Sequence, residues 1–326
     1  MGDAADANQG ADVTVVIPCH DVARIDGVRA AVQSIRAQTS PPRRIVVTVD
    51  HSPELARQLR ELEPDVVIVE NITGDRGASE NRNRGAQDVD TELLLFMDGD
   101  ETAESTWLAE LVGPLRQRQV VGTGGRVVAA WESGRPDWFP PGFGWTVGTH
   151  DEATPSGRVP VRNVWSGNMA LRTETFRRIG GFRVGFGKIG EVAQPEDTDL
   201  CIRASALEGG SWLFVPSAVT YHAVPHGRHS FSNFVRRCYG EGRGKIMLRG
   251  LYAPDARQRV LDAEDTYLRS VVPGVVRAEM RGLGQHASRL GAIAVGLGFA
   301  GVGAASGLAH QARADAGARR VRRTQG

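Results

Sequence analysis

The sequence predicts an α/β protein built on a mixed, mainly parallel β-sheet with helices on both faces. Its first hundred residues alternate four times between short aliphatic runs and helical patterns, which is typical of parallel strands joined by crossover helices. Residues 93–97 are five apolar residues in succession, as expected for a strand covered on both faces. A chain of 326 residues, 41% of them hydrophobic, is long enough to bury such a core.

The elements of the first hundred residues follow in a regular order. Strands are expected at 13–17, 45–49, 66–69 and 93–97, and helices at 26–38, 53–62 and 78–87. The loops that follow parallel strands meet at the carboxyl edge of the sheet. The sequence therefore predicts a nucleotide-sized site formed by residues 18–21, 50–51 and 98–100.

The middle of the chain contains a long irregular stretch, residues 131–160, that is rich in Gly, Pro and aromatic residues. We interpret it as a functional loop whose aromatic rings either stack on a ligand or pack among themselves. A strand is expected at 165–171. The runs 212–215 and 218–221 predict a strand pair that Pro216 interrupts.

The last hundred residues are predicted to be mainly helical. Residues 231–249 mix aromatic and basic side chains, which suits either phosphate binding or a solvated basic helix. Residues 290–308 carry no charge and are rich in Gly and Ala, with arginines on both sides. Their length allows a membrane span, whereas their weakly apolar composition suits a peripheral or packed helix equally well.

Composition narrows the function classes. A formal net charge of +1 gives no global attraction to nucleic acid, so we expect no nucleic-acid partner. Cys19, Cys201 and Cys238 are too far apart for a thiolate metal site and fit a reducing compartment. The first dozen residues lack an apolar signal core, so we expect a disordered lead and a cytoplasmic protein.

The most informative motif is Asp98-Gly99-Asp100, which follows the predicted strand at 93–97. Two carboxylates at the end of a buried strand suit Mg²⁺ or Mn²⁺, and the intervening glycine permits close approach. The alternative is that these acids cap a helix that begins near Ser105. Asp-x-Asp also occurs at 88–90 and 197–199, so the strand context decides.

Other polar residues of the predicted crevice suit a nucleotide. Asp50 can accept hydrogen bonds from a base or ribose, and Arg76 and Arg82 can face phosphates. The alternative for both arginines is a solvated helix face. Glu196 and Asp197 open a predicted helix, where they either compensate its dipole or supply a catalytic carboxylate.

Taken together, these motifs resemble family 2 inverting glycosyltransferases with the GT-A fold. The matching pieces, in order, are Val-Val-Ile-Pro-Cys-His at 15–20, Val-Asp-His-Ser at 49–52, Arg-Gly-Ala-Ser-Glu-Asn-Arg-Asn-Arg-Gly at 76–85, Phe-Met-Asp-Gly-Asp at 96–100, Ser-Gly-Asn-Met-Ala-Leu-Arg at 166–172, Gly-Gly-Phe at 180–182 and Pro-Glu-Asp-Thr-Asp-Leu at 195–200. The resemblance covers roughly residues 13–245. His51 departs from the pattern, because the family often has an acidic residue there.

The resemblance implies a role for each matching residue. It implies that Asp197 is the general base, with Glu196 as the fallback, and that Asp98, Asp100 and His222 hold the metal. His226 and His229 are rivals of His222. The residues expected to bind the nucleotide sugar are Pro18, Asp50, Arg76, Arg82, Asp98, Asn168 and Arg243.

The expected organisation is a lead at 1–11, a GT-A domain at 12–250 and a C-terminal helical segment at 251–326 with a basic tail, associated with the inner face of the cell membrane. The implied partners are a nucleoside diphosphate sugar and a glycan, lipid-carrier or small-molecule acceptor. One alternative is a haloacid-dehalogenase-type phosphatase that uses Asp98 and Asp100. Another is an inactive nucleotide-sugar-binding protein.

Overall fold

The computed structural model describes residues 11–187, 194–255 and 257–324. Contacts between Cα atoms divide the chain into two compact units. The sheet unit comprises described residues from 1–130, 155–189 and 196–223, and the helical unit those from 131–154, 190–195 and 224–326. The predicted disordered lead lies outside the described residues, except for Ala11, which begins the first strand.

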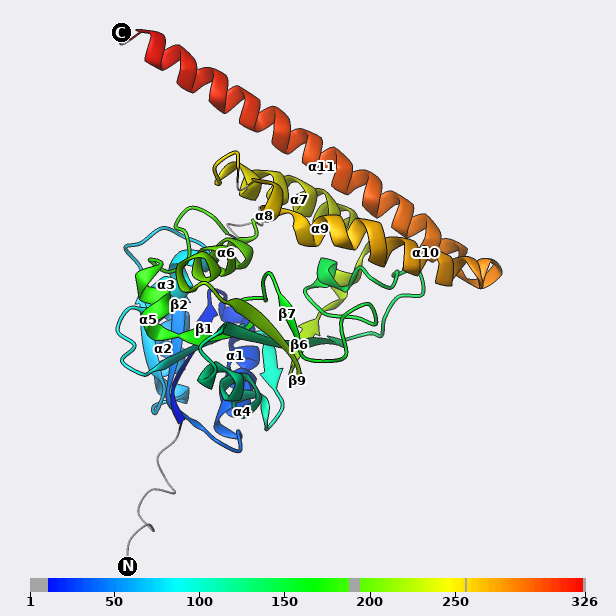
Figure 1. Cartoon of the computed structure of the whole chain (residues 1–326). Helices are drawn as coiled ribbons and strands as arrows, with labels where there is room; N and C mark the ends of the chain where they lie inside the picture. Colours follow the sequence, from blue (N-terminus) through cyan, green and yellow to red (C-terminus); the bar gives the residue numbers. More distant parts are fainter. Residues whose placement is uncertain (1–10, 188–193, 256, 325–326) are drawn as a thin grey trace, which may run out of the picture. The chain divides into compact units, whose positions relative to one another are not determined.

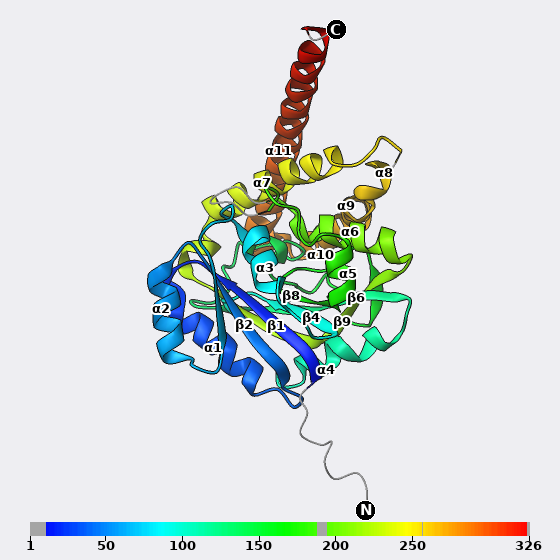
Figure 2. The same ribbon diagram turned by 90° about the vertical axis from the view of Figure 1, so that its left-hand side faces the viewer.

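The described part of the sheet unit is organised on a nine-stranded mixed sheet (Figures 1 and 2). Four neighbouring strands, β3-β2-β1-β4, are parallel. Strand β8 pairs antiparallel with β4 on one side and antiparallel with β6 on the other. The order continues through β9 to β5, and β7 also pairs with β9. The strands are β1 (Ala11–Cys19), β2 (Pro42–Asp50), β3 (Val67–Asn71), β4 (Leu93–Met97), β5 (Glu101–Ala103), β6 (Val120–Trp131), β7 (Val159–Val161), β8 (Asn168–Arg172) and β9 (Ser211–Val224).

Helices cover both faces of this sheet, which confirms the predicted fold class. Apolar residues of α1, α2 and α4 pack on one face, and those of α3, α5 and α6 pack on the other. Side chains of β4 alternate between the two cores, with Leu95 on the first face and Leu94 on the second. The helices are α1 (Ile25–Arg36), α2 (Pro53–Leu62), α3 (Ala78–Ala86), α4 (Trp107–Val112), α5 (Thr173–Arg178) and α6 (Glu196–Glu208).

The strand near Pro216 differs from the prediction. Instead of two strands broken by Pro216, the chain forms one continuous strand, β9, from Ser211 to Val224. Its pairing with β7 spans residues 212–214 and its pairing with β5 spans residues 220–222. Pro216 falls between these two paired stretches and does not end the strand.

The helical unit holds the rest of the chain. Its elements are α7 (Phe231–Gly250), α8 (Arg257–Val260), α9 (Asp262–Thr266), a π-helical turn (Tyr267–Val271), α10 (Val272–Met280) and α11 (Leu283–Thr324). Within α11, residues 286–313 are long and apolar enough to cross a membrane by length and composition. Aromatic rings from 131–154 pack against one another and against α7, for example Trp138 and Phe143 on Phe234. The irregular stretch is therefore a locally packed insert in this structure.

One close helix–sheet contact yields a stability prediction. A Cβ on Gly85 of α3 would overlap the side chains of Thr48 and Val16 on the sheet. We expect Gly85→Val to lower the free energy of unfolding by about 1–3 kcal/mol, because overpacking forces neighbouring atoms to shift. Urea unfolding at pH 7 measures this difference. Gly113→Ala is the control, since nothing lies within 4 Å of a Cβ there; an equal loss in both variants would contradict the packing argument.

Candidate active site

The Asp98-Gly99-Asp100 turn directly follows β4 at the carboxyl edge of the parallel strands. The backbone N–H of Glu101 donates to the carbonyl oxygen of Asp98 at 3.1 Å, which closes the turn. A Cβ on Gly99 would lie 3.2 Å from the carbonyl oxygen of Pro18. The glycine therefore lets this turn pack against the end of β1, and Pro18 lies next to the acidic turn as predicted from strand order.

Strand pairing brings His222 to Asp100. In the antiparallel pairing of β5 with β9, His222 is the register partner of Glu101. Its Nε2 atom lies 3.4 Å from one carboxylate oxygen of Asp100, whereas Arg24 donates to the other oxygen at 3.0 Å. The rivals His226 and His229 belong to the helical unit, where their two imidazole rings pack edge to face with centroids 4.8 Å apart.

The sequence reasoning missed Glu101, a buried carboxylate next to the acidic turn. Its side chain is only 4% exposed, and a Cβ on Gly167 would lie within 3.0 Å of oxygens of both Glu101 and Asp98. Burial, followed by the negative charge of Asp98, raises the pKa of Glu101 well above its usual range. Its place directly after Asp100 was the available signal.

A single buried guanidinium joins the two acidic motifs. Arg82 of α3 is 4% exposed and donates to Asp98 at 2.7 Å and to Glu196 at 3.3 Å. Its guanidinium also lies 5.6 Å from the ring centroid of Phe182. Arg82 was predicted to face phosphate. In this structure it instead connects the Asp98 turn, the candidate metal site, to Glu196 at the start of α6.

The first turn of α6 carries three acids with different surroundings. Asp199 is fully buried between Arg183 and Arg203, so it anchors the fold. Burial, followed by the negative charge of Asp197, raises the pKa of Glu196 to about 7, although Arg82 opposes this rise. Asp197 is half-buried, and one of its oxygens accepts a hydrogen bond from the backbone N–H of Thr198 at 2.6 Å.

Asp50 is held at the end of β2 by three neighbours. Its carboxylate accepts hydrogen bonds from the Asn71 amide at 2.9 Å and from the backbone N–H of Gly77 at 3.1 Å, and His51 Nδ1 lies 2.7 Å away. His51 has a positive φ of 50°, the left-handed backbone conformation that a tight turn requires. Asp50 is thereby fixed in the loop region where a base or ribose was predicted.

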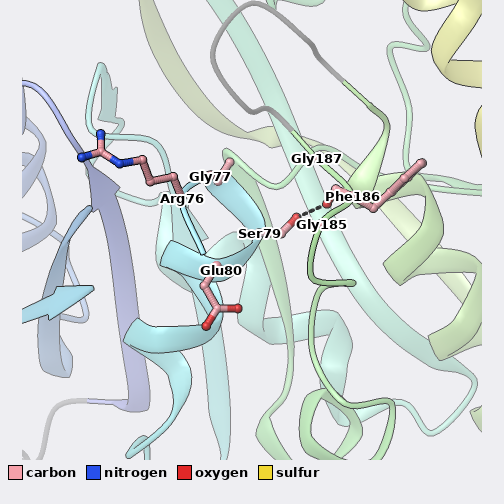
Figure 3. Close-up of a pocket in the computed structure, with 8 residues that line it drawn as sticks. Arg76, Gly77, Ser79, Glu80, Gly185, Phe186 and Gly187 are labelled. Atoms are coloured by element: carbon pink, nitrogen blue, oxygen red, sulfur yellow. Dashed lines mark hydrogen bonds between the residues drawn. The ribbon is translucent and has the colours of Figure 1, made fainter. Parts of the chain in front are cut away.

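Next to Asp50, the start of α3 and the glycine loop 185–187 line a small pocket (Figure 3). Ser79 donates from its hydroxyl to the carbonyl oxygen of Phe186, which fastens the loop to α3. One turn further along, Asn83 exchanges two hydrogen bonds of 2.8 Å with the backbone of Phe182. Arg76 is exposed at the pocket rim, and its side chain extends away from Ser79 and Phe186 (Figure 3).

The last two predicted ligand residues lie in different surroundings. Asn168 is 1% exposed. Its side-chain oxygen accepts hydrogen bonds from Trp107 Nε1 at 2.8 Å and from the backbone N–H of Gly125 at 3.1 Å, and its side-chain nitrogen donates to the Thr220 hydroxyl at 3.1 Å. These contacts favour a scaffold role. Arg243 belongs to α7 in the helical unit.

The cluster fits a divalent cation by its chemistry. Among the described residues, no three His, Cys, Asp or Glu side chains enclose an ion by themselves. Mg²⁺, however, commonly takes one or two carboxylates together with substrate phosphates. Asp98 and Asp100 offer carboxylate oxygens beside the imidazole of His222, and oxygen ligands with one imidazole suit Mg²⁺ or Mn²⁺.

The raised pKa of Glu196 predicts a pH-dependent effect of Glu196→Gln. The folded state favours the protonated acid, so this contribution to stability is complete below about pH 4.5 and is lost as the pH rises to about 7. Gln mimics the protonated form at every pH. We therefore expect the variant to gain stability over the parent progressively from pH 4.5 to 7 and then to level off. Urea unfolding at pH 4.5, 6 and 8 tests this, and a pH-independent difference would contradict it.

Comparison with known proteins identifies relatives. The family described as Glycosyl transferase family 2 matches residues 14–180. The chain is 27% identical over 264 residues to a glucosyl-dolichyl phosphate glucuronosyltransferase of Haloferax volcanii, which covers 80% of this chain and 83% of the relative.

Two solved structures share the fold. One is the mannosyltransferase PcManGT of Pyrobaculum calidifontis in complex with GDP-Man and Mn²⁺, with a TM-score of 0.55 and 18% identity, covering 94% of this chain and 81% of that one. The other is GalNAc-T7 with UDP, GalNAc and Mn²⁺, with a TM-score of 0.51 and 19% identity, covering 80% of this chain and 55% of that one. Because both identities are low, the likeness shows the fold alone.

Proposed function

Because the chain belongs to glycosyl transferase family 2 and is therefore a glycosyltransferase, we propose that it moves a sugar from a nucleoside diphosphate sugar to an acceptor by one inverting displacement. The observation that carries this proposal is the acidic cluster at the end of β4, where Asp98 and Asp100 lie beside His222 and connect through Arg82 to Glu196. It is supported by the fold neighbours, one solved with GDP-Man and Mn²⁺ and the other with UDP, GalNAc and Mn²⁺.

We propose that Asp98, Asp100 and His222 hold Mg²⁺ or Mn²⁺ against the donor diphosphate. When bound, the cation would offset the negative charge that develops on the leaving diphosphate. Asp50 would accept hydrogen bonds from the base or ribose, because Asn71 and Gly77 fix its carboxylate at the end of β2. Arg82 would keep Asp98 oriented, since its buried guanidinium donates to the Asp98 carboxylate at 2.7 Å.

In this proposal Asp197 takes the proton of the acceptor hydroxyl. Its position in the first turn of α6 favours the ionised carboxylate, because the helix N-terminus is partially positive. Glu196 beside it is paired with the buried guanidinium of Arg82 at 3.3 Å, so its carboxyl group is already engaged within the protein. The engagement of Glu196 with Arg82 supports Asp197 over Glu196.

The phosphatase alternative is not favoured. The family match spans residues 14–180 and includes the Asp98 turn, which follows the fourth strand along the chain. The nucleophile motif of a haloacid-dehalogenase-type phosphatase normally follows the first strand of its domain. An inactive binding protein is also disfavoured, because both the Asp98 turn and the α6 carboxylates remain in place.

We propose further that the acceptor is lipid-linked and that the chain associates with a membrane surface. The name of the Haloferax volcanii relative includes a dolichyl phosphate sugar. Residues 286–313 supply a helix apolar enough to meet lipid. A lipid carrier would then present its hydroxyl or sugar at the surface where the enzyme works.

The metal proposal predicts that Asp100→Ala weakens donor binding. Removing one carboxylate ligand takes away several kcal/mol of charge stabilisation, so we expect nucleoside diphosphate to bind at least about 100-fold less tightly with Mn²⁺ present. Titration calorimetry with UDP, GDP and TDP measures this. Asp88→Ala is the matched control, because Asp88 is an exposed acid of the other Asp-x-Asp pattern. Equal affinity of Asp100→Ala and the parent would refute the assignment.

The base proposal predicts that Asp197→Asn removes transfer and spares donor binding. The amide keeps an oxygen that accepts the Thr198 N–H, yet it cannot take a proton. Loss of a general base typically lowers the rate by about 10² to 10⁴. Single-turnover transfer to a hydroxyl acceptor and donor affinity should be measured together. Undiminished transfer would exclude the role, and a collapse of donor affinity would reassign Asp197 to the donor site.

A further inference from the structure

We propose that α11 lies in the plane of an anionic membrane surface, with one face on α7 and the opposite apolar face in lipid, and that it does not cross the bilayer. This inference rests on the membrane association proposed above and specifies its mode. The sequence alone allows a span, a peripheral helix or a packed helix for residues 290–308. The contacts of α11 within the helical unit distinguish these cases.

One face of α11 is fitted closely to α7. A Cβ on Gly303 would overlap the carbonyl oxygen of Tyr239, and a Cβ on Gly242 of α7 would overlap that of Ala300. Two hydrogen bonds join the same faces, from Tyr239 to the Ser306 hydroxyl at 2.9 Å and from Gln311 to the carbonyl oxygen of Ile246. Glycines let the two backbones approach this closely, so the pair is a specific packing unit.

The opposite face of α11 is exposed and free of charge. Its largest side chains, Phe299, Val302 and Leu308, are 43%, 58% and 48% exposed. Together with the exposed small residues between them, these side chains recur every three to four positions, which places them along one side of the helix. The exposed uncharged residues are Gly291, Ala294, Gly298, Phe299, Gly301, Val302, Ala305, Leu308 and Ala309.

The charges of α7 argue against a span. α7 runs alongside α11 (Figure 1) and carries Arg236, Arg237, Glu241, Arg243, Lys245 and Arg249. Tyr239 meets Ser306 inside the uncharged stretch of α11, so inserting the pair would carry the charges on either side of Tyr239 toward the hydrocarbon core. Such burial is strongly unfavourable. Insertion of α11 alone would instead break its fit to α7. An in-plane position keeps both the packing and the hydration of the charges.

The charge distribution identifies the lipid. Residues 224–326 contain seventeen Lys and Arg against seven Asp and Glu, whereas the preceding 223 residues contain twenty-two against thirty-one. The overall net charge of +1 conceals this asymmetry. A basic segment with an exposed apolar helix face is attracted to anionic headgroups and then inserts shallowly. The acidic remainder of the chain is repelled by the same surface.

Depth measurements test the orientation in the full-length protein. Single cysteines at Gly291, Phe299 and Leu308 would be labelled with an environment-sensitive fluorophore and mixed with vesicles of phosphatidylcholine and phosphatidylglycerol. The native cysteines are buried, which limits background labelling. We expect blue-shifted emission at all three positions, with equal shallow quenching by lipid-attached quenchers. A label at Leu62 of α2, also exposed at 46%, is the control and should not shift.

Two results would overturn the proposal. Deep quenching at Phe299 with shallow quenching at Gly291 and Leu308 would indicate a span, because these positions would then sit at the centre and the two edges of the bilayer. Absence of a blue shift at all three positions would show that lipid does not cover this face. Neither result would bear on the transferase assignment, which donor binding and transfer to a soluble acceptor measure separately.

A charge substitution provides an independent readout. We expect Phe299→Glu with Val302→Glu to reduce binding to the anionic vesicles by more than about tenfold, because the carboxylates would enter lipid. Leu62→Glu with Leu207→Glu adds the same charge at comparably exposed positions of the sheet unit and should change binding little. Both variants should retain Mn²⁺-dependent nucleotide binding. Equal loss in the two variants would show that net charge alone drives association and would overturn the role of the α11 face.

Discussion

The buried ion bridge of Arg82 is the interaction on which the arrangement of the site depends. Arg82 reaches Asp98 after β4 and Glu196 at the start of α6, two segments nearly one hundred residues apart in sequence. Arg82 itself is buried, so removing both acids would leave an uncompensated charge inside the fold, which is strongly destabilising. The bridge therefore couples the metal-site candidate to the helix that carries Asp197, and neither can shift without disturbing the other.

The site combines residues positioned by parallel strand pairing with a residue positioned by antiparallel pairing. The parallel half places Pro18, Asp50 and Asp98 at a common carboxyl edge, as alternating strands and helices dictate. The antiparallel half then adds His222 through the pairing of β5 with β9. The residues proposed to bind the nucleotide and those proposed to bind the metal thus meet at Asp98, because the two kinds of pairing share strand β4.

Local patterns in the sequence were sufficient to predict most of the first hundred residues and the acidic turn. They predicted α2 to the residue because Pro53 begins it and its apolar spacing is regular. Contacts between distant segments were not predictable in this way. The pairing of Arg82 with Glu196, the burial of Glu101 and the scaffold contacts of Asn168 all depend on side chains from different strands or helices. The predicted strand break at Pro216 was wrong, because the effect of a proline in a strand depends on which neighbouring residues are paired.

The glycine fit between α7 and α11 also limits how the chain can be shortened. Removing α11 to improve solubility would uncover the face of α7 around Tyr239 and Gly242, together with the aromatic cluster that Gly296 contacts through Phe143 and Phe234. Removing the apolar outer face of α11 would therefore expose a new apolar surface on α7. An enzyme engineered to stay dispersed should therefore keep both helices and carry polar substitutions only on the outer face of α11.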